Sequence, residues 1–196
     1  MTTTETLVAI IVPIVIILIL IAVGTGLVVR RRHLKARFGP EYDRAVSAGD
    51  SRMSAERELH SREKRHRDLD IRELSPEDRE RYAAEWKGTE EHFVDQPGRS
   101  VDDADRLVTR LMKDRGYPTE GFEQQLKDLS VDHARTLENY RSAHDVGLRN
   151  KRGDATTEEL RGAMVHYRTL FRELLSSPGD HDYTARGEGT ARHDAA

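Results

Sequence analysis

The chain has 196 residues, no cysteine, and 32 Lys and Arg against 35 Asp and Glu. The absence of cysteine excludes disulfides, thiolate zinc sites and cysteine nucleophiles. Five basic residues and one acidic residue precede position 38, which leaves 27 basic against 34 acidic residues in the rest of the chain. This negative balance argues against nucleic acid as a partner.

An unbroken apolar run from Leu7 to Val29 predicts a membrane-spanning helix. About 23 residues at a rise of about 1.5 Å give a length of about 35 Å, which exceeds a hydrocarbon core of about 30 Å. A cleaved signal peptide is the alternative, but it requires basic residues before the run, and residues 1–6 carry Glu5 and no Lys or Arg. We therefore expect a short extracytoplasmic N-terminus at 1–6 and a transmembrane helix at 7–29.

A basic juxtamembrane collar at 30–37 follows the span directly. Its charged residues are Arg30, Arg31, Arg32, Lys35 and Arg37. Because positive flanks stay in the cytoplasm, we expect a single-pass protein of the cell membrane with its N-terminus outside. The collar either sets this topology with snorkelling side chains or also binds anionic lipid headgroups. Ala22 and Gly26 form a small-xxx-small pair that permits a weak homodimer.

Residues 38–74 are predicted to form a charged helical stalk. Pro40 suits the first turn of a short helix, which the sequence Gly-Asp-Ser at 49–51 ends. From Ser51 to Asp70 most side chains are charged, and opposite charges three or four residues apart support a solvated helix. The sparse apolar positions there do not sustain heptads, so we do not expect a long coiled coil.

Residues 75–176 carry the apolar periodicity of amphipathic helices and predict a small cytosolic helical bundle. We expect helices to start at Ser75, Ser100, near Ser130 and at Thr156. Gly116 is expected to close one helix, because glycine tolerates a left-handed final turn. No segment alternates as a strand does, so the fold class is all-α. Residues 177–196 have almost no apolar content and are expected to form a disordered tail.

The candidate interaction surface comprises Trp86, Phe93, Tyr117, His133 and His144. Trp86 and Phe93 belong to an aromatic stripe, and Tyr117 lies in a connector punctuated by glycine and proline. His133 and His144 are expected to share one helix face, about 16 Å apart along the axis, which is too far to bind one metal ion. We expect no metal and no cofactor.

Five short segments carry a resemblance to a known family. They are residues 38–43 (Phe-Gly-Pro-Glu-Tyr-Asp), 69–72, 93–97, 115–118 and 130–133. They resemble a family of uncharacterised single-pass membrane proteins found mainly in actinobacteria, whose members are often labelled hypothetical or secreted. The resemblance covers most of residues 38–175 and implies no activity, cofactor or catalytic residue. The label "secreted" conflicts with the charges of the collar, which favour a cytosolic C-terminal part.

The sequence contains no P-loop, no dinucleotide-binding glycine motif, no His-Glu-x-x-His and no Gly-x-Ser-x-Gly. We therefore favour a non-enzymatic, membrane-anchored helical module, an adaptor or regulatory subunit, that binds the lipid bilayer and an unknown protein partner. The alternative is a tethered small-molecule-binding or hydrolytic domain that uses His133, His144 and His166 with neighbouring carboxylates.

Overall fold

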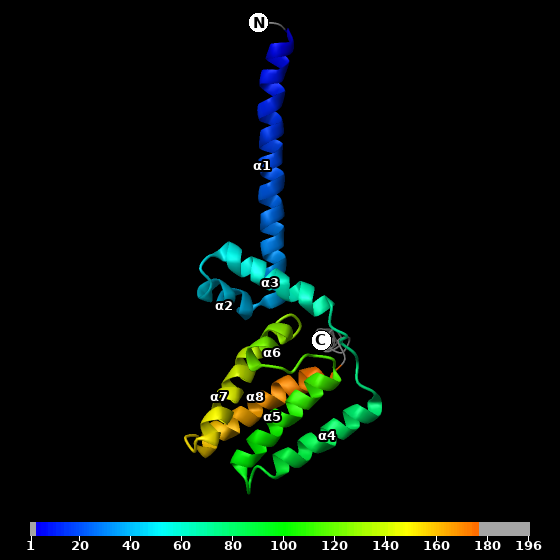
Figure 1. The fold of residues 1–196 in the computed structure, drawn as a ribbon, viewed down its shortest axis with the longest axis vertical. Helices are drawn as coiled ribbons and strands as arrows, with labels where there is room; N and C mark the ends of the chain where they lie inside the picture. Colours follow the sequence, from blue (N-terminus) through cyan, green and yellow to red (C-terminus); the bar gives the residue numbers. More distant parts are fainter. Residues whose placement is uncertain (1–2, 177–196) are drawn as a thin grey trace, which may run out of the picture. The chain divides into compact units, whose positions relative to one another are not determined.

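The computed structural model describes the backbone of residues 3–176 and the side chains of residue 12 and of residues 15–176. Every regular element in this described part is an α-helix, which confirms the predicted all-α class (Figure 1). The helices are α1 (Thr3–Phe38), α2 (Pro40–Ala48), α3 (Arg52–Arg67), α4 (Pro76–Glu91), α5 (Pro97–Asp114), α6 (Phe122–Leu129), α7 (Leu137–Lys151) and α8 (Thr157–Leu175). The chain divides into two units, residues 1–61 and residues 62–196.

In the first unit, α1 continues without a break through the basic collar to Phe38. Gly39 then adopts a positive φ of 45°, which reverses the chain, and Pro40 occupies the first turn of α2 as predicted. α2 ends at Ala48, where the Gly-Asp-Ser break was expected, and α3 begins at Arg52.

Two polar contacts hold the helices of the first unit to one another. The hydroxyl of Tyr42 on α2 donates to Glu56 Oε1 on α3 at 2.8 Å, and Lys35 Nζ on α1 lies 3.6 Å from Asp43 Oδ1 on α2. Leu59 on α3 is fully buried, although the segment around it was predicted to be a solvated helix. The three helices are therefore packed with one another rather than arranged as a single continuous rod.

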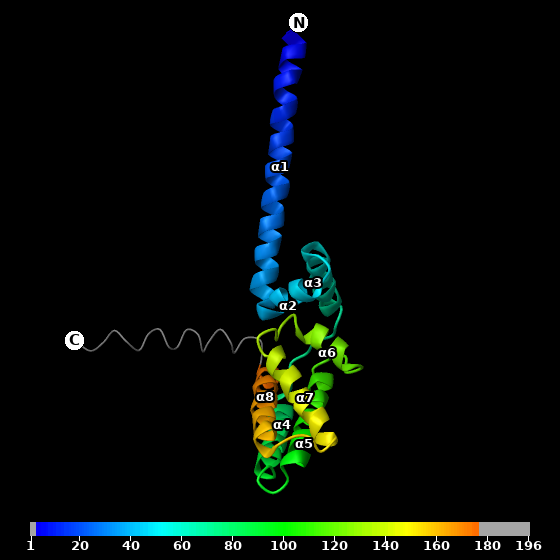
Figure 2. The same ribbon diagram turned by 90° about the vertical axis from the view of Figure 1, so that its left-hand side faces the viewer.

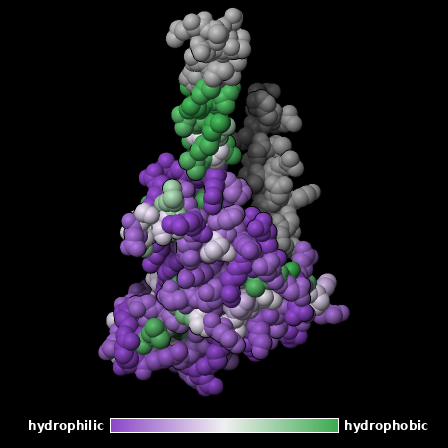
Figure 3. Space-filling model, turned by 45° about the horizontal axis from the view of Figure 1, so that its top comes forward, coloured by the Kyte–Doolittle hydropathy of each residue, from purple (hydrophilic) through white to green (hydrophobic). Residues whose placement is uncertain are grey.

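The described apolar side chains of α1 are exposed from Val15 to Val29. Figure 3 shows them as an apolar band, in contrast to the mainly hydrophilic surface of the second unit in the same view. Within the part of the chain that the structure describes, no helix is both long and apolar enough to cross a membrane. The described residues therefore do not support the predicted span at 7–29. Their apolar side chains run from Val15 to Val29, directly before Arg30. The side chains of residues 7–11, 13 and 14 lie outside the described residues.

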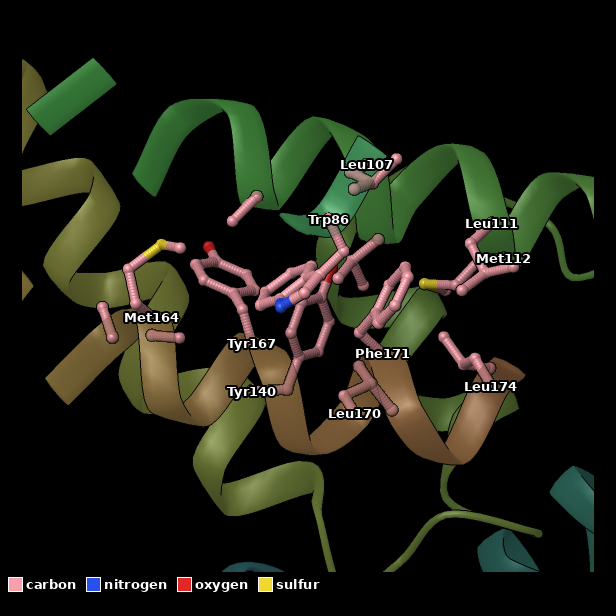
Figure 4. Packing of buried hydrophobic residues seen from close by; sticks show 14 of the residues in the cluster. Trp86, Leu107, Leu111, Met112, Tyr140, Met164, Tyr167, Leu170, Phe171 and Leu174 are labelled. Carbon is pink, nitrogen blue, oxygen red and sulfur yellow. The ribbon is translucent and has the colours of Figure 1, made fainter. Parts of the chain in front are cut away.

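The second unit is a helical bundle, as predicted. α8 packs against α4, α5 and α7, and α5 also packs against α4 and α7 (Figures 1 and 2). Apolar residues at helical spacing on α5 and α8 face this shared core, so that burial of one stripe per helix stabilises the bundle. The aromatic members Trp86, Tyr140, Tyr167 and Phe171 point into the space between these helices (Figure 4).

Helix capping explains where two of these helices begin. The Ser75 hydroxyl accepts the backbone N–H of Asp78 at 3.0 Å, and Thr156 forms a reciprocal capping box with Glu159. Both starts were predicted from sequence. The helix expected from Ser100 instead begins at Pro97, because proline suits the first turn of a helix. The helix expected from near Ser130 begins at Leu137, because the chain forms turns between α6 and α7. The predicted tail at 177–196 lies outside the described residues.

Candidate functional site

The structure distributes the five predicted interaction residues over the second unit. Trp86 is buried and stacks on Phe171 with ring centroids 4.6 Å apart (Figure 4). Tyr117 and His133 are also buried, whereas Phe93 and His144 are partly exposed. Trp86 and Tyr117 therefore stabilise the bundle from inside and do not offer a surface for a partner.

His133 belongs to a closed hydrogen-bonding cluster. Its Nδ1 lies 3.0 Å from Glu173 Oε2 on α8, and its Nε2 lies 3.4 Å from the hydroxyl of Tyr117. Thr136 Oγ1 also donates to Glu173 Oε2, at 2.9 Å. Burial raises the pKa of the Tyr117 hydroxyl, so this group stays protonated at neutral pH. Both ring nitrogens of His133 have protein partners, which leaves neither of them open for a ligand.

His144 belongs to a second cluster, centred on Asp105. The His144 ring stacks on Phe122 at 3.7 Å, and its Nδ1 lies 3.7 Å from Asp105 Oδ1. The hydroxyl of Tyr167 donates to the same carboxylate oxygen at 2.8 Å. Burial alone would raise the pKa of Asp105, but His144 and Tyr167 outweigh it and hold the pKa below its usual value.

The positions of the histidines in the structure differ from those predicted. His133 precedes α7 and His144 lies within it, so the expectation that they share one helix face is wrong. His166 lies on α8 and forms no hydrogen bond or ring contact with either among the described residues. In that same part of the chain, no group of three or more His, Asp or Glu side chains is arranged to hold a metal ion.

A groove beside Phe93 is lined by apolar and basic side chains of the second unit. Its floor includes Phe93 from the segment after α4, and Met164 and Val165 from α8. Arg161 and Arg168 border it, and Arg168 Nη1 lies 3.5 Å from Glu90 Oε1. The side chain of Val165 is 45% exposed, so an apolar contact is available at this groove.

A larger groove runs between α4 and α5, and its charges are mostly neutralised by one another. Arg110 Nη2 lies 2.5 Å from Glu85 Oε2 across the two helices, and Arg106 pairs with Asp103 on α5. Such paired, exposed charges stabilise the fold little. We regard the groove beside Phe93 as the better contact surface of this unit, because it exposes the apolar side chain of Val165 beside Phe93 and Met164.

The first unit contains the predicted anchor and orientation residues. Val29 and the three arginines Arg30, Arg31 and Arg32 are exposed, whereas Lys35 is near Asp43. Arg37 has partners of its own. The side chain of Leu7 lies outside the described residues.

Sequence reasoning missed two arginines that α3 brings to the collar. Arg52 and Arg57 line one groove together with Arg30 and Arg31 of α1. A charge count along the stalk could not find them, because acidic residues lie between them and the collar in sequence. Comparisons with known proteins add no assignment: no family model, no curated protein and no solved structure matches this chain.

Proposed function

We propose that the protein is a membrane-anchored helical interaction module, an adaptor or regulatory subunit, whose second unit binds a protein partner in the cytoplasm. The observation that carries this proposal is the apolar band of α1, whose side chains from Val15 to Val29 are exposed and are followed at once by arginines. An exposed apolar surface of this extent needs a cover in water.

A lipid bilayer is the cover that fits this helix. The apolar sequence extends from Val15 back to Leu7, and each Ile, Leu or Val near the centre of a span favours insertion by roughly 0.3–0.6 kcal/mol. The collar would then lie at the cytoplasmic interface, with the second unit on the same side and residues 1–6 outside. Arginine side chains are long enough to keep their charges among the headgroups.

The groove beside Phe93 is the proposed contact surface for the partner. Its apolar residues Phe93, Met164 and Val165 can bury the apolar side chain of another protein, while Arg161 and Arg168 at the edge are paired with Glu158 and Glu90. A hydrolytic role that uses His133 has less support, since both of its ring nitrogens contact protein groups.

The proposal is tested by quantitative capture from native membranes with full-length protein. Val165→Asp places a charge in the groove, and Leu148→Asp, at a 42% exposed apolar position on α7 outside this groove, is the matched control. We expect partners captured by wild type and by Leu148→Asp to fall roughly tenfold or more with Val165→Asp, as for a central interface residue.

Two results would contradict the proposal. One is capture of the same proteins, in the same amounts, by wild type and Val165→Asp. The other is the absence of any enrichment over an unrelated single-span anchor. Circular dichroism of both variants establishes that they are folded.

A further inference from the structure

Four arginines gather in one groove of the first unit, where the apolar band of α1 ends. Arg30 and Arg31 come from α1, and Arg52 and Arg57 come from the first turns of α3. All four side chains are exposed. Guanidinium groups are always charged at physiological pH, so the groove holds a fixed concentration of positive charge.

The positive charge of this groove is little compensated by the protein. Glu56 is the one carboxylate among its lining residues, and it accepts the hydrogen bond from Tyr42. Among the described residues, neither Arg30 nor Arg52 forms an ion pair with a carboxylate. The groove therefore favours an anionic ligand, because charge-assisted hydrogen bonds to guanidinium groups are strong.

Apolar side chains line the same groove. Leu27 and Val28 belong to the last turn of the apolar band, and Met53 on α3 is 67% exposed. The methionine side chain does not bind a small hydrated anion, but it can make apolar contacts with a hydrocarbon chain. The groove thus offers positive charge and apolar contact to one ligand.

We infer that this groove binds the phosphate headgroup of an anionic phospholipid, with Arg30, Arg31, Arg52 and Arg57 on the phosphate and Met53 against the acyl chains. Arginine suits this role because its planar fork can donate two parallel hydrogen bonds to phosphate oxygens. The inference rests on the membrane anchoring proposed above, and it adds Arg52 and Arg57 of α3 to the basic residues of the collar.

Native mass spectrometry of the full-length protein in detergent tests the inference, with phosphatidylglycerol and phosphatidylcholine of identical acyl chains as probes. Wild type should retain phosphatidylglycerol in preference to phosphatidylcholine. The double variant Arg52→Gln/Arg57→Gln should lose this preference by about thirtyfold, as expected for two charges near a headgroup. Both substitutions lie on α3, so the apolar run and the collar stay intact.

The control is Arg99→Gln/Arg152→Gln, which removes the same charge from exposed positions of the second unit and should retain phosphatidylglycerol as wild type does. Equal retention by the two double variants would overturn the inference. Displacement of the lipid by an equal concentration of inorganic phosphate would also overturn it in favour of a free-phosphate site.

Carbonate extraction of membranes that contain the wild-type chain separates the two proposals. A chain that is extracted into solution contradicts membrane anchoring. A chain that stays in the membrane but shows no lipid preference contradicts only the lipid site.

Discussion

Two charged side chains of the second unit, Arg115 and Asp105, are wholly or partly buried and form hydrogen bonds with neighbouring protein groups. Arg115 is buried, and its Nη1 donates to the backbone carbonyls of Leu174 at 2.7 Å and Ser176 at 3.2 Å. This arrangement places a positive charge at the carboxyl end of α8, where the helix dipole and the unpaired carbonyls favour a cation. Asp105 is the corresponding anion, held by Tyr167 and His144.

We predict that Asp105→Asn lowers the stability of the second unit in a pH-dependent way. A carboxyl whose pKa is lowered in the folded state contributes stability above its ordinary pKa of about 4, and this stability is lost as the pH falls through the folded value. The deficit of the variant should be about 1–3 kcal/mol at pH 7 and should shrink at pH 3. Urea unfolding, followed by the fluorescence of Trp86, the single tryptophan, measures it.

Asp145→Asn is the control for this prediction, since Asp145 is an exposed carboxylate with a neighbouring Arg149 on the same helix. It should change stability by less than about 1 kcal/mol at either pH. A deficit of Asp105→Asn that is the same at pH 7 and pH 3 would show that the charge of Asp105 does not contribute.

At the scale of elements, the connector between α3 and α4, residues 68–75, crosses the end of α5 with the two backbones in contact. Arg72 N–H donates to the Arg115 carbonyl at 3.0 Å, which fixes the crossing. Gly116 adopts a φ of +90°, and a Cβ at this position would lie 2.0 Å from the carbonyl oxygen of Asp70. Gly116 is therefore needed both for the left-handed turn, as its sequence position predicted, and for the close approach of two backbones.

We predict that Gly116→Ala destabilises the second unit by about 2–5 kcal/mol, because it combines a strained positive φ with a backbone clash. Gly121→Ala separates the two effects: its φ is +79°, but no atom lies within 4 Å of an added Cβ. That variant should lose only about 1–2 kcal/mol. Thermal unfolding of both variants gives the comparison, and equal losses would rule out a contribution of the clash.

The helices themselves were predictable where the signals are local. Pro40, Ser75 and Thr156 mark helix starts through preferences of the first turn and through capping hydrogen bonds, and all three lie where expected. The helix expected from near Ser130 was misplaced, because its apolar spacing continues through residues that form turns before α7. Val131 and Ala134 are buried in these turns, and their spacing of three residues is the same as that of apolar residues on one face of a helix.

For the whole molecule, the proposed orientation in the membrane decides on which side the second unit lies. The proposed arrangement puts residues 1–6 outside and both the collar and the second unit inside, because basic residues follow the apolar run directly. The groove of α1 and α3 would then meet the cytoplasmic leaflet, which carries anionic lipids.

We predict that a cysteine in place of Thr4 reacts with a membrane-impermeant maleimide on intact cells, whereas a cysteine in place of Val94 reacts only after permeabilisation. The chain has no native cysteine, so each variant carries a single thiol, and Val94 is 86% exposed. Labelling of both positions after permeabilisation is the control. Labelling at position 94 on intact cells would reverse the orientation and place the second unit outside.

The sequence by itself determined the all-α class, the helix starts at Pro40, Ser75 and Thr156, the apolar run and the collar of basic residues, since these depend on neighbours within a few turns of the same helix. Only the tertiary structure decided which side chains meet. It enclosed Trp86 and Tyr117, placed His133 before α7 and His144 within it, and brought Arg52 and Arg57 beside Arg30 and Arg31. These juxtapositions depend on turns and on packing between segments distant in the chain, and residue spacing carries no information about them.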